Sequence, residues 1–157
     1  MQPTLAIGDR VLVDKVRRST TRPVKRGRLA EERHRGFHPP RDLQVMSSAV
    51  QCSSRLRVVA VAGDQVVVRR GLLYVNKKPA RPFPNVYCCN WSSRRTSYSW
   101  GPTVVPKGHV IVLGDCRDAS FDSHIWGPLP AQNVIGYARA RVWPMRRVAW
   151  FSRNPSP

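Results

Sequence analysis

The stretch RVVAVAGDQVVVRRGLLYVNKKP, residues 57–79, contains three valine-rich segments separated by the Gly63-Asp64 pair and by Gly71. β-Branched residues favour extended backbone, whereas glycine and aspartate together are typical of a tight turn. The stretch therefore predicts a β-meander of short strands joined by tight turns.

Further strand patterns lie on both sides of this meander. Residues 10–14 (RVLVD) are rich in valine, residues 109–113 (HVIVL) form an apolar run, and residues 134–143 alternate apolar and polar side chains before Pro144. No long amphipathic helical pattern accompanies them. We therefore expect an all-β fold, a folded sheet or barrel with long irregular loops, in a single domain over residues 1–157.

The positive charge of the chain is densest in one block. The sequence has 27 Lys and Arg against 9 Asp and Glu, a formal net charge of +18, and residues 17–41 carry the densest part of it. Residues 16–56 contain Pro23, Pro39 and Pro40 and few apolar residues in register, so we expect a basic loop with little regular structure.

This basic block suggests a protein that binds nucleic acid or an anionic membrane. The block contains a single aromatic residue, Phe37, and lacks the interleaved stacking residues of a single-strand binder. We therefore favour a solvated loop and do not expect nucleic acid to be a partner.

Other classes of protein find little support in the sequence. The apolar runs at residues 58–62 and 110–113 are far shorter than the roughly 18 residues of a membrane span, and residues 1–10 lack the pattern of a signal peptide. The cysteines form no CxxC pair and most of the histidines are dispersed, so we expect free thiols and no metal site. These residues are Cys52, Cys88, Cys89, Cys116, His34, His38 and His109.

A polar cluster, GDCRDASFDSHIWGPLP at residues 114–130, follows the apolar run of residues 109–113. Its aspartates can accept hydrogen bonds from turn backbone, and Arg117 has carboxylates on both sides. There are two alternatives to a catalytic role: a loop whose polar groups only hydrogen-bond to one another, and a loop that binds calcium. Arg117 inside the loop and the missing glutamate at its twelfth position argue against calcium.

Three segments in order give the chain a family resemblance: MQPTLAIGDRVLVDK, RVVAVAGDQVVVRRGLLYVN and GDCRDASFDSHIWGPLPAQNVIGYARARVWP. Together they resemble the type I signal peptidase family, and DSHIWGPLP is most similar to its cyanobacterial and thylakoidal branch. The resemblance implies a membrane-anchored serine endopeptidase that removes signal peptides with a Ser-Lys dyad in a β-fold. It implies no metal or organic cofactor.

The resemblance also assigns roles to individual residues. It places Ser120 beside the catalytic lysine, which this serine helps to orient, and Met1 and Pro3 along the substrate groove. The residues that brace the loop carrying Ser120 are Asp115, Arg117, Asp118 and Asp122. The nucleophilic serine would precede Met1, outside this chain, and so would the membrane anchor.

The chain departs from the family at the position of the general base. Family members have Lys-Arg-Val-Val where this chain has Leu56-Arg57-Val58-Val59. Leucine cannot accept a proton and Arg57 stays protonated, so we expect no complete dyad and no peptide hydrolysis by the chain as written.

A second departure is RLAEERHRG at residues 28–36, which replaces a strand of the family and which we expect to remove that strand. A frame shift or retained intron, or divergence into an inactive paralogue, would account for both departures. The inactive paralogue could act as the basic binding protein considered above.

The expected partners are signal-peptide-bearing preproteins, and membrane lipid through an anchor that is not in this chain. The expected location is the thylakoid or bacterial plasma membrane, in preference to the mitochondrial inner membrane. The fragment alone would be soluble.

Overall fold

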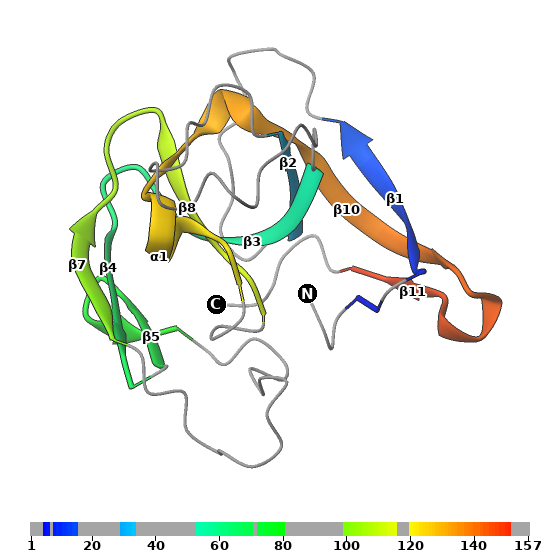
Figure 1. Cartoon of the computed structure of the whole chain (residues 1–157), viewed down its shortest axis with the longest axis horizontal. Coiled ribbons are helices and arrows are strands. Elements are labelled where there is room, and N and C mark those ends of the chain that lie inside the picture. Colours follow the sequence, from blue (N-terminus) through cyan, green and yellow to red (C-terminus); the bar gives the residue numbers. More distant parts are fainter. Residues whose placement is uncertain are drawn as a thin grey trace, which may run out of the picture.

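The computed structural model describes residues 5–6, 8–15, 29–33, 53–70, 72–80, 99–115 and 120–151. Their strands form two antiparallel sheets (Figure 1). In the larger sheet the order is β1 (Arg10–Lys15), β10 (Val134–Trp143), β2 (Leu29–Arg33), β3 (Ser53–Val61), β8 (His109–Leu113) and β9 (Leu129–Pro130), and β11 (Ala149–Trp150) also pairs with β10. In the smaller sheet the order is β6 (Lys78–Pro79), β5 (Leu72–Val75), β4 (Gln65–Arg69) and β7 (Trp100–Val104).

The helical content of the described residues is small. It consists of the single turn α1 (Ser123–Trp126) and the 3₁₀ turns η3 (Ala131–Asn133) and η4 (Met145–Arg147). Among the described residues, no helix has both the length and the apolar character needed to span a bilayer. The all-β fold class predicted from the sequence is confirmed.

The Gly63-Asp64 turn carries the chain from the larger sheet to the smaller one. Strands form where the valine-rich pattern predicts them, but β3 pairs with β2 and β8, whereas β4 pairs with β5 and β7. The expected meander is therefore wrong at its first turn and correct for the β4–β5 pair. The turn has Gly63 at φ +86°, and the Asp64 carboxylate accepts a hydrogen bond from the Val61 amide at 2.9 Å.

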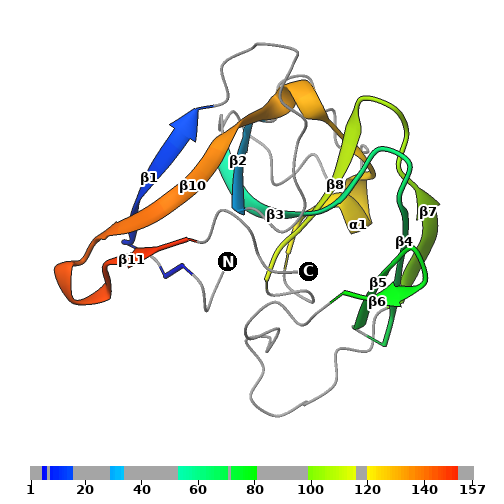
Figure 2. The ribbon, with the colours of Figure 1, turned by 180° about the vertical axis from the view of Figure 1, so that it is seen from behind.

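Residues 56–60 of β3 are buried on both faces of the strand, which explains this change of sheet. Val59 points into an apolar cluster shared with the smaller sheet, whereas Leu56 and Val58 point to a second cluster on the opposite face. Strand β8 alternates in the same way, with Ile111 on the first side and Val112 on the second. The smaller sheet therefore covers one face of the β3–β8 pair, as seen from both sides in Figures 1 and 2.

The expectation of little regular structure over residues 16–56 is wrong at two places. Strand β2 occupies residues 29–33 and pairs with both β10 and β3, and β3 already begins at Ser53. A strand is thus present within residues 28–36, where we expected a strand to be lost. Backbone pairing on both sides stabilises an extended conformation despite the low apolar content of LAEER. Residues 16–28 and 34–52 lie outside the described residues.

Candidate functional site

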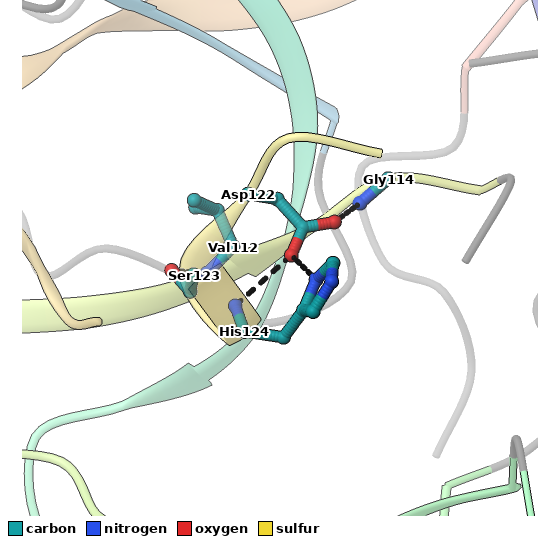
Figure 3. A network of polar contacts seen from close by, with 5 residues as sticks. All are labelled: Val112, Gly114, Asp122, Ser123 and His124. Carbon is teal, nitrogen blue, oxygen red and sulfur yellow. Dashed lines mark hydrogen bonds and ion pairs between the residues drawn. The ribbon is translucent and has the colours of Figure 1, made fainter. Parts of the chain in front are cut away.

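The carboxylate of Asp122 lies at the centre of the polar cluster (Figure 3). This side chain is fully buried, and its Oδ2 accepts a hydrogen bond from the Gly114 amide at 2.8 Å. Its Oδ1 caps α1 by accepting from the His124 amide at 3.1 Å, and lies 2.6 Å from His124 Nδ1. Asp122 therefore joins the end of β8 to the start of α1.

Ser123 makes a second connection between α1 and β8. Its hydroxyl is fully buried and accepts a hydrogen bond from the Val112 amide at 3.0 Å. This residue was not singled out in the sequence, where its only signal is its position directly after an aspartate that can cap a helix. With Asp122, it fixes the segment after Ser120 to the sheet.

Asp115 forms a buried bidentate pair with Arg57 of β3. Arg57 Nε lies 3.0 Å from Asp115 Oδ1, and Arg57 Nη2 lies 3.2 Å from Asp115 Oδ2. Their side chains are 11% and 3% exposed, so the two charges compensate each other away from bulk water. This pair links the strand that carries position 56 to the polar cluster.

Ser120 lies directly against Gly114. A Cβ atom built on Gly114 would come within 2.1 Å of Ser120 Oγ and 2.6 Å of Ser120 Cβ. The side chain of Ser120 thus fills the space that any residue larger than glycine would need at position 114. Gly114 is required for this close approach, which the sequence pattern did not indicate.

The register of β3 and β8 relates Ser120 to position 56. Arg57 is opposite Leu113 and Val58 is opposite Val112, so one further step of the same register places Leu56 opposite Gly114. Opposed residues project from the same face of a sheet. The Ser120 hydroxyl and the Leu56 side chain therefore lie on the same face of the β3–β8 pair, one strand apart.

The surroundings of Leu56 are apolar. This residue is 6% exposed and belongs to a cluster whose other members are Val58, Val110, Val112, Leu129, Val134 and Tyr137. Such a site can lower the pKa of a lysine amine, because burial disfavours the charged form. Leucine offers no lone pair, so the base that the family resemblance expects at this position is missing.

The described lysines do not substitute for this missing base. Lys15 lies at the end of β1, while Lys77 and Lys78 lie at the β5–β6 turn and Lys107 lies between β7 and β8. All of these described lysines are exposed. None of them has the burial on which Ser-Lys chemistry depends.

The other residues predicted for the site lie outside the described residues. They are Met1, Pro3, Arg117 and Asp118, and the four cysteines also fall there. Within the described ranges, no group of three His, Cys, Asp or Glu side chains is arranged to hold a metal ion. The roles of the site residues remain predictions drawn from the resemblance.

A family profile described as "Signal peptidase, peptidase S26" matches residues 1–143. The chain belongs to this family.

The similar relatives include cyanobacterial and chloroplast proteins, which confirms the predicted branch. The chain is 34% identical over 156 residues to "Signal peptidase I" of Leptolyngbya laminosa, covering 99% of this chain and 70% of that protein. It is 36% identical over 151 residues to "Thylakoidal processing peptidase 1, chloroplastic" of Arabidopsis thaliana, covering 95% of this chain and 41% of that protein.

A further relative is "Probable signal peptidase I-2" of Synechocystis sp., at 33% identity over 94% of this chain and 61% of that protein. The chain thus spans less than two thirds of two of these three relatives. A crystal structure of a signal peptidase I from Enterococcus faecalis superimposes with a TM-score of 0.50, at 18% identity, over 74% of this chain and 97% of that one. This likeness supports the fold.

Proposed function

We propose that this signal peptidase homologue binds signal-peptide-bearing preproteins but does not cleave them by a Ser-Lys mechanism. The observation that supports the proposal is the burial of Leu56 in an apolar cluster, at the position where the resemblance expects the general base. Around it, the Arg57–Asp115 pair and the contact of Ser120 with Gly114 preserve the surrounding scaffold.

The chemical argument concerns the nucleophile. A serine hydroxyl attacks a peptide carbonyl poorly unless a neighbouring base takes its proton. Loss of general-base catalysis alone lowers a rate by roughly a hundredfold to ten-thousandfold. An aliphatic side chain at position 56 removes this contribution completely but does not by itself prevent a peptide from binding.

The proposed partners and location follow from the family. Preproteins with a signal peptide are the proposed ligands, and membrane lipid would be contacted through an anchor outside this chain. A thylakoid or bacterial plasma membrane is the proposed location. As a second candidate, the net charge of +18 favours binding of an anionic membrane or nucleic acid by residues 17–41.

The proposal is tested by binding and cleavage measured on the same sample. The fluorescence anisotropy of a labelled peptide that spans a small-x-small cleavage site is measured with increasing concentrations of the chain, and mass spectrometry then checks whether the peptide is intact. The control peptide has the same charge but bulky residues at the two small positions. We expect binding of the first peptide, weaker binding of the control, and no cleavage.

Either of two results would contradict this proposal. Cleavage of the first peptide by the unmodified chain would show that hydrolysis does not need a lysine at position 56. Equal binding of both peptides, weakened strongly by added salt, would instead favour the basic-binding function.

A further inference from the structure

The segment at residues 5–9 is fixed against the edge of the larger sheet. Leu5 is 5% exposed and packs with Ala138 of β10, together with the partly buried Val11 and Phe151. The chain then turns at residues 6–9, where the Asp9 amide donates to the Ala6 carbonyl at 3.2 Å. Leu5 and the turn therefore define the direction in which the chain enters β1.

The carboxylate of Asp9 holds this turn. Its Oδ2 accepts a hydrogen bond from the Ala6 amide at 2.9 Å, and its Oδ1 accepts one from Arg147 Nη1 at 3.0 Å. Arg141 Nη1 lies 3.6 Å from the same carboxylate. The Asp9 side chain is only 1% exposed, so its charge depends on these two arginines for compensation.

Arg147 belongs to a segment beyond the family match, which ends at residue 143. The segment folds back along β10: Ala149 and Trp150 pair with Arg141 and Ala140, and the Phe151 amide donates to the Arg139 carbonyl at 2.7 Å. Arg141 Nε also donates to the Arg147 carbonyl. Both views show β11 beside the short N-terminal segment (Figures 1 and 2).

We propose that residues 144–151 clamp the N-terminal segment in place, with Asp9, Arg141 and Arg147 as positioning residues for the peptide-binding site. This inference rests on the proposed function, because the resemblance places the groove residues Met1 and Pro3 just upstream of Leu5. Four residues of extended chain span at most about 14 Å, so the fixed position of Leu5 limits where the groove residues can lie. A segment beyond the end of the family profile would thus contribute to the site.

The test compares variants of the full chain by hydrogen exchange and by peptide binding. R147M removes the charge but retains most of the side-chain length, and R146M is the matched control at an exposed neighbour on the same 3₁₀ turn. In R147M we expect the amides of Ala6 and Asp9 to exchange roughly tenfold to a hundredfold faster, because a charged hydrogen bond to a buried partner is lost. Exchange in β8 should stay unchanged.

The same variants separate positioning from general stability. We expect R147M to bind the signal-peptide-derived peptide at least several-fold more weakly, with R147K recovering part of the affinity because it keeps the positive charge facing Asp9. D9N retains an acceptor for the Ala6 amide but loses the ion pairs, so it should behave like R147M.

The outcomes distinguish this inference from the proposed function. Exchange at Ala6 and Asp9 that is equal in R147M, R146M and the unmodified chain would overturn the clamp. Fast exchange with unchanged peptide affinity would overturn its positioning role. A chain that binds no peptide even without substitution would overturn the proposed function, and with it the positioning role, while the exchange data would still decide whether the clamp exists.

Discussion

Substitution of Leu56 by lysine tests whether position 56 still has the properties of a general-base site. The side chain at this position is enclosed by an apolar cluster and lies on the same face as Ser120. A lysine amine placed there would lose most of its hydration, and its pKa would be lowered. The stability of L56K should therefore depend on pH in a way that no apolar residue at this position can reproduce.

The direction of this dependence follows from the two states of the amine. Above a pH of about 10.4, the pKa of a lysine in the unfolded chain, the amine is neutral in both the folded and the unfolded chain. Its ionisation then has no effect on stability. As the pH falls, the unfolded chain binds a proton that the folded chain binds less well, so the folded state loses stability. For a fully buried lysine the loss at pH 7 is roughly 4 to 5 kcal/mol, because only about 3.4 pH units separate pH 7 from the pKa of the unfolded lysine.

The Ser120 hydroxyl on the same face favours the lower end of this range, because it can hydrogen-bond to the amine. Since a domain of this size is stable by about 5 to 15 kcal/mol, L56K should lose a large part of its stability at pH 7 and recover most of it at pH 10. L56M is the matched control, because it keeps an apolar side chain of similar volume. It should lower the free energy of unfolding by less than about 1.5 kcal/mol at every pH.

Urea denaturation of both variants, followed by tryptophan fluorescence between pH 7 and pH 10, measures the effect. We expect the gap between L56K and L56M to narrow by several kcal/mol as the pH rises. A gap that stays constant over this range would refute the reasoning, because it would show that an amine at position 56 reaches water and that the fold does not enclose a base there.

Three further substitutions test the contacts around this position. G114A should lower the free energy of unfolding by about 1 to 3 kcal/mol and displace Ser120, because the new Cβ overlaps the Ser120 side chain. An unchanged free energy of unfolding in urea would contradict this close approach. D115N should lower the free energy of unfolding by about 3 to 5 kcal/mol, because it leaves Arg57 without its buried carboxylate. A loss no greater than that caused by the same substitution at an exposed aspartate would mean that this pair is not buried in solution. D122A should leave the Gly114 amide without its acceptor, at a cost of about 1 to 3 kcal/mol, and should speed hydrogen exchange at that amide; exchange at the rate of the unmodified chain would argue against the network in Figure 3.

The strands could be predicted from sequence where their own residues decide the conformation. Strands β3, β4, β5, β8 and β10 are rich in valine and other β-formers, and their positions match the apolar pattern. Strand β2 could not be predicted in this way, since LAEER is extended because it pairs with β10 and β3. The change of sheet at Gly63-Asp64 could not be predicted either, because the same turn residues occur in hairpins and in connections between two sheets.

The site was predictable in its composition but not in its pairings. The aspartate-rich loop after residue 113 indicated capped turns, and Asp122 indeed caps α1. The partner of Asp115, however, is an arginine 58 positions earlier, and no local pattern links the two. The need for glycine at position 114 likewise appears only once the loop has folded back and placed Ser120 against it.

The most direct test of the account is a cleavage assay on two chains that differ only at position 56. Because the family resemblance places the nucleophile before Met1, both chains carry a serine directly ahead of Met1, and one also carries L56K. Each is incubated with a peptide that contains a small-x-small site, at a pH where L56K is folded, and the products are identified by mass spectrometry. The account predicts cleavage by the L56K chain and none by the chain that retains Leu56. Equal cleavage by both chains would contradict it, because hydrolysis would then not depend on a base at position 56.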